Sequence, residues 1–279
     1  MSSLARLDHA VINVHMAMDK AESCFQELGF TVTPRGYHSL GSINHLMIFG
    51  SDYLELIGLP ADGSAARREL LDGPVGIDGL VFKTVDVDAD FARLQQLQMA
   101  GDPPKAFSRP VDIDGAAAEA RFRTVHCHKA AFPEGRVYFC EHGTPEFVWR
   151  PSWQSHANGV TAMCEIVLGA AAPQAVAERY GRLLAQTPVA IEDGFQVAFQ
   201  DCQLQILNAA GLAARFAHMA RPIGDAEVVF AALVMTTGKL DQARQIAERA
   251  GSFAVNSTGA NRFAVKTAEF DTVIEFVAD

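Results

Sequence analysis

One arrangement of apolar segments recurs four times along this 279-residue chain: a strand, an amphipathic helix and then two or three further strands. The first helix has Ala21, Cys24, Phe25 and Leu28 on one face and ends at Gly29. The arrangement repeats at intervals of roughly 70 to 80 residues. Its expected opening strands are Leu7–Val14, Gly79–Val85, Val160–Val167 and Val228–Met235. The pattern predicts an α+β protein made of four βαβββ modules.

A polar, turn-rich segment at residues 150–159, with the sequence RPSWQSHANG, lies between the second and third modules. We therefore expect a first domain at residues 1–150, a linker at 151–159 and a second domain at 160–279. The modules are expected at residues 6–60 and 77–149 in the first domain, and at 160–208 and 228–278 in the second. Apolar residues make up 49% of the chain, which is enough for two ordinary cores.

The charge of the chain limits its partners. The formal net charge is -10, and Lys and Arg form no cluster of the kind on which nucleic-acid and anionic-membrane binding depends. No apolar run approaches the roughly 20 residues that cross a bilayer. The five cysteines are scattered without CxxC spacing, which is typical of reduced thiols. We expect a cytoplasmic protein that binds a small-molecule substrate, as a monomer or a homodimer, without nucleic acid or membrane.

Two ionisable residues stand in otherwise apolar strand segments. His9 lies in LDHAVINV at residues 7–14, and Glu55 lies in YLELI at residues 53–57. Burying an imidazole or a carboxylate without a partner costs several kcal/mol, so each side chain requires a ligand, an ion pair or a solvated cavity. A shared divalent metal would satisfy both residues.

Several segments carry a family resemblance: GYHSLGSIN at residues 36–44, YLEL at 53–56, FCEHGTPE at 139–146 and WRPSW at 149–153. They resemble the glyoxalase-like domain family within the vicinal oxygen chelate superfamily. The resemblance implies that two modules form one domain, with curled, mostly antiparallel sheets around a cleft. It also implies a divalent metal (Fe, Mn, Ni, Co or Zn) held by the first and last strands of each module, with positions left open for a substrate that has two adjacent oxygens.

The resemblance assigns metal ligands in the first domain. His9 and Glu55 match the first-strand and last-strand positions of the first module, whereas Gly79 or Leu80 stands opposite His9 in the second module and supplies no ligand. On the last strand of that module, Glu141 and His142 alternate faces. By analogy with Tyr53 and Glu55, we favour the Tyr138–His142 face. His9, Glu55 and His142 would then form a two-His-one-carboxylate set, although a slip of one residue would select Glu141.

The second domain lacks such a set. Opposite His9 it has Ala162 in the third module and Phe230 or Ala231 in the fourth, and opposite Glu55 it has Gln205 and Glu275. One carboxylate does not hold a catalytic metal. We therefore expect a degenerate glyoxalase-like domain that serves packing, substrate enclosure or association.

Other polar residues are candidates for substrate binding and proton transfer. His38 and Asn44 lie in a loop that leads into a strand, and Arg150 lies at the end of the first domain, so these three are expected to bind substrate. His126, in the segment HCH at residues 126–128, is expected to act as a base beside Glu55. The alternatives are a turn held by the Ser42 and Asn44 side chains, a polar strand end before Pro133 for the HCH segment, and a contact that ties the domains together for Arg150.

The leading hypothesis is a metal-dependent vicinal oxygen chelate enzyme of the lyase or isomerase type, acting on a small oxygenated metabolite. In this scheme Glu55 or His126 moves a proton next to oxygens that the metal binds. An extradiol-type dioxygenase with a His/His/Glu Fe(II) site is one alternative. A non-catalytic protein that binds a small molecule or confers resistance to it is another.

Overall fold

The computed structural model describes residues 5–62, 67 and 69–279, and its first eight strands form one sheet. The half of the chain that contains this sheet is called the first domain below. Its helices are α1 (Met18–Glu27), α2 (Glu69–Asp72) and α3 (Val87–Gln96). Its strands are β1 (Arg6–Asn13), β2 (Gly36–Tyr37), β3 (Ile43–Ile48), β4 (Tyr53–Gly58), β5 (Gly76–Thr84), β6 (Lys105–Ile113), β7 (Ala116–His126) and β8 (Arg136–His142).

The second domain repeats this plan with eight more strands. Its helices are α4 (Pro173–Leu184), α5 (Ala209–Phe216) and α6 (Leu240–Ala250). Its strands are β9 (Val160–Ala170), β10 (Val189–Ile191), β11 (Gly194–Phe199), β12 (Cys202–Leu207), β13 (Val228–Thr237), β14 (Ala254–Gly259), β15 (Arg262–Thr267) and β16 (Thr272–Ala278).

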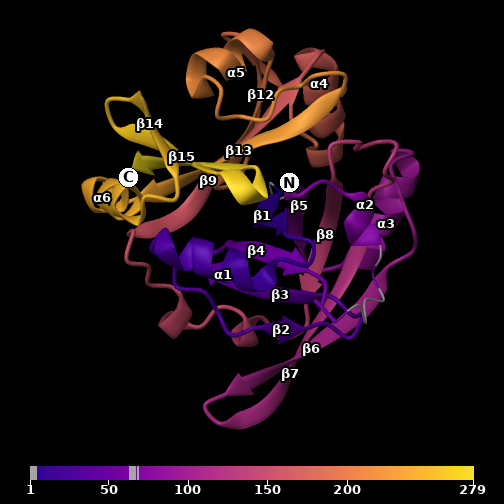
Figure 1. Cartoon of the computed structure of the whole chain (residues 1–279). Coiled ribbons are helices and arrows are strands. Elements are labelled where there is room, and N and C mark those ends of the chain that lie inside the picture. Colours follow the sequence, from indigo (N-terminus) through magenta and orange to yellow (C-terminus); the bar gives the residue numbers. More distant parts are fainter. Residues whose placement is uncertain (1–4, 63–66, 68) are drawn as a thin grey trace.

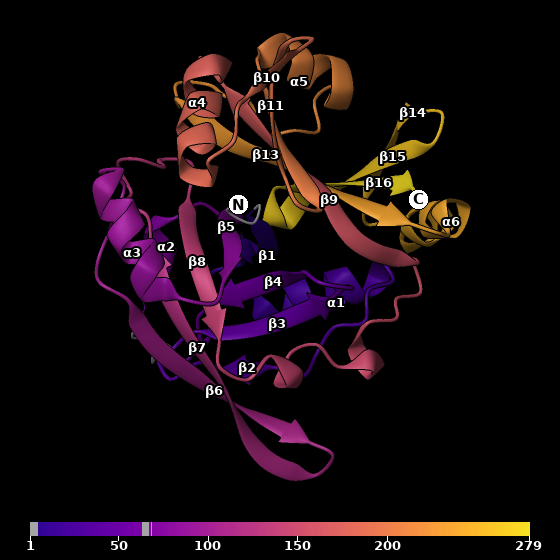
Figure 2. The same ribbon diagram turned by 180° about the vertical axis from the view of Figure 1, so that it is seen from behind.

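The two sheets have the same internal order. It is β2-β3-β4-β1-β5-β8-β7-β6 in the first sheet and β10-β11-β12-β9-β13-β16-β15-β14 in the second. The pairs β1–β4, β5–β8, β9–β12 and β13–β16 are parallel and the others are antiparallel. Figures 1 and 2 show the second sheet stacked on the first, with the β6–β7 hairpin projecting at the opposite end. The predicted α+β fold with mostly antiparallel, paired βαβββ modules is confirmed.

Alternation of side chains along β1 shows why the first sheet encloses a site. Ala10 and Ile12 face the apolar core shared with α1, where they pack with Ala21 and Phe25. His9 and Val11 point to the other face because successive strand residues alternate. The first sheet therefore has an outer apolar core and an inner face that carries His9.

The inner face of each sheet is filled differently. In the first domain the edge strands β2 and β6 approach each other, and the Ser39 amide donates to the Ser108 carbonyl at 2.8 Å, so the sheet nearly closes into a barrel around a cavity. In the second domain Leu212 and Phe216 of α5 pack against the inner face of the sheet. The first sheet keeps a cavity of about 830 Å³.

The domains share an apolar core. Phe30 stacks on Phe276 with ring centroids 6.3 Å apart, and Phe82 meets Phe199 edge-to-face at 5.5 Å. Burial of each phenylalanine stabilises the fold by about 1.5–3 kcal/mol. Residues of the predicted linker are tied to the first domain, since the His156 imidazole lies 2.9 Å from the Ile48 carbonyl.

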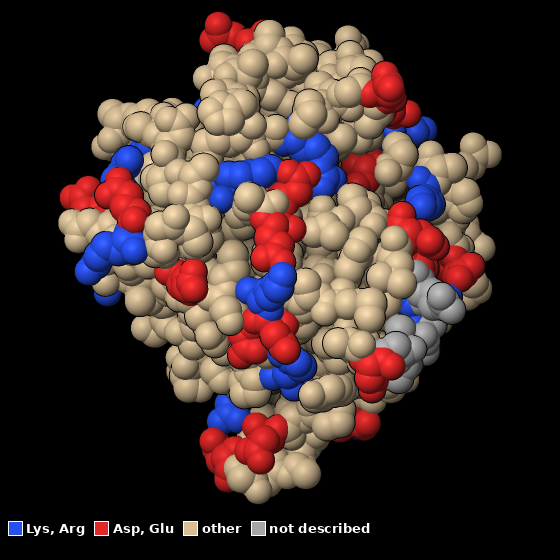
Figure 3. All heavy atoms as spheres, viewed as in Figure 1, with Lys and Arg blue, Asp and Glu red and all other residues tan. Residues whose placement is uncertain are grey.

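The surface carries charges of both signs. Figure 3 shows acidic and basic side chains side by side in a band across one face. Exposed ion pairs of this kind, such as Lys20–Glu269 at 2.9 Å, contribute less than about 1 kcal/mol. In the described part of the chain, no helix is long and apolar enough to cross a membrane.

One local expectation was wrong. A strand is expected from the apolar and β-branched residues at Phe30–Thr33, directly after Gly29, but the structure has no strand there and places β2 at Gly36–Tyr37. Thr33 instead acts as an anchor, because its hydroxyl accepts from the Leu46 amide at 2.9 Å and its carbonyl contacts the His45 ring at 2.7 Å. This segment therefore bonds to β3 through Thr33 and to Ser155 and His156 through Thr31, without forming a strand.

Asp52, in the β3–β4 turn, makes a buried contact between the domains and accepts from the Met163 amide at 3.1 Å. Burial raises the pKa of its carboxyl from 3.8 to about 7, because it outweighs the Met163 hydrogen bond and the Lys83 charge. The folded protein then holds the proton of the Asp52 carboxyl to a higher pH than the unfolded chain does.

The free energy of unfolding should therefore fall as pH rises between about 4 and 7. Asp52→Asn should remove this component and stabilise the protein at pH 8 by a few kcal/mol, as measured by urea unfolding across pH. An unchanged pH profile would contradict this prediction.

Candidate functional site

The cavity inside the first sheet has a volume of about 830 Å³. It combines apolar walls with several titratable side chains. The lining includes His9, His38, Asn44, Leu46, Tyr53, Glu55, Arg67, Asp78, Phe107, Arg109, Phe122, His126, Arg136 and Tyr138. A cavity of this size with few convergent polar groups is typical of a small-molecule site.

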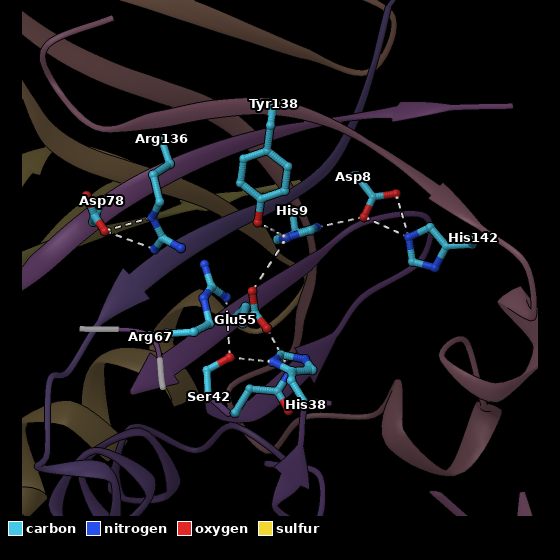
Figure 4. Close-up of polar contacts among 11 residues, drawn as sticks. Asp8, His9, His38, Ser42, Glu55, Arg67, Asp78, Arg136, Tyr138 and His142 are labelled. Atoms are coloured by element: carbon cyan, nitrogen blue, oxygen red, sulfur yellow. Dashed lines mark hydrogen bonds and ion pairs between the residues drawn. The ribbon is translucent and has the colours of Figure 1, made fainter. Parts of the chain in front are cut away.

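His9 is the centre of the polar network (Figure 4). Its Nδ1 lies 2.7 Å from Asp8 Oδ1, while its Nε2 lies 3.2 Å from the Tyr138 hydroxyl and 3.6 Å from Glu55 Oε2. The ring is stacked on Tyr53 with centroids 4.3 Å apart. Because an ionised carboxylate only accepts, Nδ1 carries the proton that Asp8 accepts. In the neutral ring Nε2 is then the acceptor nitrogen, and it faces the Tyr138 hydroxyl and Glu55.

Asp8 is fully buried behind His9. The His142 Nε2 donates to Asp8 at 3.0 Å, and the Lys83 ammonium lies 3.9 Å away. Burial alone would raise the pKa of Asp8, but His142 and His9 together hold it well below its ordinary value. An ionised Asp8 therefore fixes the orientation and tautomer of His9.

Glu55 is oriented by a neighbouring amide. Asn44 Nδ2 donates to Glu55 Oε1 at 2.6 Å, which leaves Oε2 directed at His9. Both residues are buried and line the cavity. The predicted site residues Asn44, Glu55 and His9 are therefore brought together by the adjacent strands β3, β4 and β1.

His38 and His126 also line the cavity. His38 Nδ1 hydrogen-bonds Ser42 at 2.9 Å, and Ser42 accepts from Arg67 at 3.3 Å. His126 stacks on Tyr138 with centroids 4.3 Å apart. Burial lowers the pKa of His38 to about 4 and that of His126 to about 3. Both rings are neutral at pH 7 and are poor proton acceptors there.

Arg150 lies outside the cavity, which corrects its expected role in substrate binding. Its guanidinium donates to Asp114 at 2.7 Å and lies over the Trp153 ring. The segment that holds it follows β8, and its neighbours Trp149 and Trp153 pack against the apolar cluster that contains Val11 and Tyr53. Its position in sequence, close to the motif-bearing strand, does not bring the side chain inward.

Strand register identifies the residue that corresponds to His9 in the second module. The pairing of β1 with β5 skips Asp8 in one strand and Asp78 in the other, so these two residues correspond and His9 corresponds to Gly79. Gly79 rather than Leu80 therefore stands at this position. A Cβ on Gly79 would lie 2.9 Å from the Val11 side chain. Val11 thus leaves no room for a ligand there.

The same strand register shows which residue of β8 corresponds to Glu55. His9 pairs with Tyr53, and Gly79 pairs with Arg136, so Glu55, two residues after Tyr53, corresponds to Tyr138. The fourth position of the site is therefore Tyr138, four residues before the predicted His142. The preference for the Tyr138 face agrees with the cavity lining.

The predicted ligand set of His9, Glu55 and His142 does not converge on one point. Glu55 lies at Nε2 of His9, whereas His142 reaches the network through Asp8 at the opposite nitrogen. Figure 4 shows His142 beyond Asp8, on the far side of His9 from Glu55. Glu141 points elsewhere and accepts from the Val87 amide at the start of α3, at 3.1 Å. His142 therefore supports Asp8, and neither candidate on β8 faces Glu55.

Two groups of donors are candidates for a metal. Among the described residues, Asp8, Cys140 and His142 are the group of three whose donor atoms lie within 4.8 Å of one another. The Lys83 ammonium beside Asp8 already supplies a positive charge and opposes a cation there. The other group is His9 and Glu55. The Asp8 hydrogen bond that frees Nε2 of His9, and the 3.6 Å between Nε2 and Glu55 Oε2, fit two ligands of one divalent ion.

In the second domain an arginine occupies the corresponding centre. In the first sheet, Val81 of β5 pairs with His9 and with Tyr138. In the second sheet, the corresponding residue Val234 of β13 pairs with Glu165 and with Glu275. Glu165, and not Ala162, thus corresponds to His9, and Ala232, paired with Val167, replaces the expected Phe230 or Ala231. Gln205 and Glu275 stand where expected.

Arg215 of α5 contacts all three side chains and balances the charge of the two glutamates. It donates to Glu165 at 2.5 Å, to Gln205 at 3.0 Å and to Glu275. The sequence patterns did not predict α5, so this cation was missed. An amphipathic segment beside two strand carboxylates that lack a counter-ion was the available signal.

Comparisons with known proteins agree with this architecture. A family model described as a glyoxalase-like domain matches residues 7–184. No curated protein sequence matches the chain. Among solved structures, a hypothetical protein from Staphylococcus aureus is similar, with a TM-score of 0.66 and 10% identity over 99% of this chain and 100% of that one.

Two similar structures have names that state an activity. A variant of 4-hydroxymandelate synthase from Streptomyces coelicolor has a TM-score of 0.56 and 12% identity, over 99% of this chain and 93% of that one. A fusion of a xylose isomerase-like TIM barrel with 4-hydroxyphenylpyruvate dioxygenase has a TM-score of 0.59 and 11% identity, over 99% of this chain and 49% of that one. At such identities the likeness concerns the fold.

Proposed function

Since the chain belongs to the glyoxalase-like domain family, with the fold of the vicinal oxygen chelate superfamily, we propose that it is a metal-dependent enzyme of the lyase or isomerase type. Its substrate is a small oxygenated metabolite bound in the first-domain cavity. The observation that carries the proposal is the arrangement of His9 Nε2 and Glu55 Oε2, which face each other at 3.6 Å inside that cavity.

His9 and Glu55 are the residues that would hold the ion. When bound, a divalent ion polarises neighbouring substrate oxygens and makes an adjacent C–H more acidic. Asp8 accepts from Nδ1 of His9, so Nε2 is the nitrogen that would face the ion, and Asn44 holds one oxygen of Glu55. The Tyr138 hydroxyl, 3.2 Å from Nε2, can donate a hydrogen bond to negative charge that develops on the substrate.

Proton transfer is assigned to Glu55. Of the two residues predicted from sequence to act as bases, Glu55 lies at the His9 centre, whereas His126 lies behind the Tyr138 ring with a pKa of about 3. General-base catalysis requires the base to lie within reach of the substrate proton, and Glu55 meets this requirement at the His9 centre. His126 is therefore proposed to hold Tyr138 in place by stacking.

A dioxygenase is the second candidate. The observation in its favour is that a protein of similar fold is named as a fusion with 4-hydroxyphenylpyruvate dioxygenase. Both candidates use the same cavity, and they differ in whether turnover consumes O₂.

Glu55→Gln should abolish catalysis in the first-domain cavity. Metal-loaded protein is incubated in D₂O with 2-hydroxy and 2-oxo carboxylic acids, and exchange of a substrate C–H is followed by proton NMR while an electrode records O₂. The lyase or isomerase proposal predicts exchange without O₂ uptake, and a loss of about 10²-fold or more in Glu55→Gln, because the base is removed.

The exposed Glu146, outside the cavity, provides the matched control, and Glu146→Gln should leave the rate unchanged. Uptake of O₂ with turnover would select the dioxygenase. Absence of both signals with every compound would overturn the enzyme proposal in favour of a non-catalytic binding protein.

A further inference from the structure

We propose that Arg109 binds a carboxylate group of the substrate, so that the metabolite handled by this cavity is a small organic acid. This assignment rests on the proposed function for the identity of the site, but the anion binding itself is measurable without turnover. The residue is on β6, lines the cavity and is 4% exposed.

Arg109 is a buried guanidinium with a free edge. Its Nε and Nη2 have no hydrogen-bond partner within the described residues. These two nitrogens direct their N–H groups to the same side, which is the edge that binds both oxygens of a carboxylate. Leaving a buried charged donor unpaired is costly, and most such groups in proteins have a partner. A bound carboxylate would supply that partner.

Three other cationic side chains in the cavity wall are paired, and a fourth, Lys129, is exposed. Arg136 lies 2.9 Å from Asp78, Arg67 lies 2.8 Å from Glu69, and Lys105 lies 2.7 Å from Asp102. Arg109 differs because no described carboxylate lies within ion-pair distance of it, although the charge of Glu55 acts on it. Among the described cations that line the cavity, Arg109 is therefore the buried one that has no carboxylate partner.

The backbone makes room for this side chain. A Cβ on Gly36 would lie 2.2 Å from Asn44 Oδ1, 3.1 Å from Arg109 Cδ and 3.3 Å from its Nη1. Gly36 is in β2, the edge strand that meets β6 where the barrel closes. The absence of a side chain at Gly36 thus lets Asn44 and Arg109 both point into the cavity. Asn44 links this corner to Glu55 at 2.6 Å.

The surroundings favour a monocarboxylate over a phosphate. The wall around Arg109 contains Phe107 and Phe122, stacked 5.2 Å apart, which suit the apolar body of an organic acid. One guanidinium edge matches the two oxygens of a carboxylate, whereas phosphate carries more charge and is opposed by Glu55. The carboxylate on Arg109 would leave the oxygenated carbons of the substrate toward Asn44 and Glu55.

Isothermal titration of the full-length protein with pyruvate, lactate and benzoate tests the proposal, with their neutral amides and inorganic phosphate as comparison ligands. We expect at least one acid to bind at least 10-fold more tightly than its amide and than phosphate. Arg109→Gln should weaken that acid at least 10-fold, and Arg109→Lys should give an intermediate affinity because it keeps the charge without the fork. Gly36→Ala should also weaken it by displacing Arg109.

Arg150→Gln, outside the cavity, is the matched control and should bind as the native protein does. Equal affinities in Arg109→Gln and native protein, equal affinities for acid and amide, preference for phosphate, or no acid bound below 10 mM would each overturn the assignment. Repeating the titrations with and without added Mn²⁺ separates the two proposals. Arg109-dependent acid binding in a protein that takes up no metal would sustain this inference and contradict the proposed function.

Discussion

Replacing Arg215 by alanine is expected to destabilise the protein by about 3–5 kcal/mol. The guanidinium contacts Glu165 and Glu275, whose side chains are 8% and 0% exposed, so the substitution leaves two buried carboxylates without this cation. Arg262 also contacts Glu275 at 3.3 Å but does not reach Glu165. Urea unfolding at pH 7.5 measures the loss.

The exposed Arg182 of α4 provides the control, and Arg182→Ala should change the unfolding free energy by less than about 0.5 kcal/mol. Adding Glu165→Gln and Glu275→Gln to the Arg215→Ala variant should restore part of the stability, because the unpaired charges are removed. A loss below about 1 kcal/mol in Arg215→Ala would contradict the view that this arginine serves as the internal cation of the second domain.

His9→Ala is expected to weaken binding of a divalent ion by a factor of about 10³ or more, because one of two protein ligands is lost. Asp8→Asn should weaken it by about 10- to 100-fold, the range typical of residues that orient a histidine ligand. Calorimetric titration of apo-protein with Zn²⁺ and Mn²⁺ gives both affinities. His218→Ala, at an exposed position in the second domain, is the control and should bind normally. Equal affinities in all variants would show that the ion binds elsewhere.

Much of the fold was predictable because apolar periodicity is a local property. In each βαβββ module the apolar periodicity indicates the first strand and the helix. His9 and Glu55 are recognisable because they are ionisable residues in apolar strands. Their convergence follows from the parallel pairing of β1 and β4. The sequence alone therefore predicts that His9 and Glu55 lie in one site.

Register was not predictable, because it depends on single skipped residues. The pairing of β1 and β5 passes over Asp8 and Asp78, and each skip exchanges the faces that follow. Those skips place Gly79 and Tyr138 at the positions equivalent to His9 and Glu55, and they direct His142 to Asp8. A pattern of alternating residues contains no signal for such a bulge.

The arginines were missed for a different reason. Arg109 stands in a strand segment of mixed polarity, where a charged residue is unremarkable. Its burial depends on the approach of β2 to β6. Arg215 lies in α5, between the segments assigned to the third and fourth modules. The role of each arginine depends on residues that are distant in the sequence. The residues next to it in the sequence do not indicate that a cation is needed there.

The central claim is that His9 and Glu55 hold a catalytic metal in the first-domain cavity, and metal analysis of the purified protein tests it most directly. The protein is prepared without a chelator or a histidine tag, together with His9→Ala, Glu55→Ala and His218→Ala. The account predicts about one divalent ion per chain in the native protein and in His218→Ala, and loss of that ion in the other two variants. Native protein without stoichiometric metal, or an unchanged content in His9→Ala and Glu55→Ala, would contradict it.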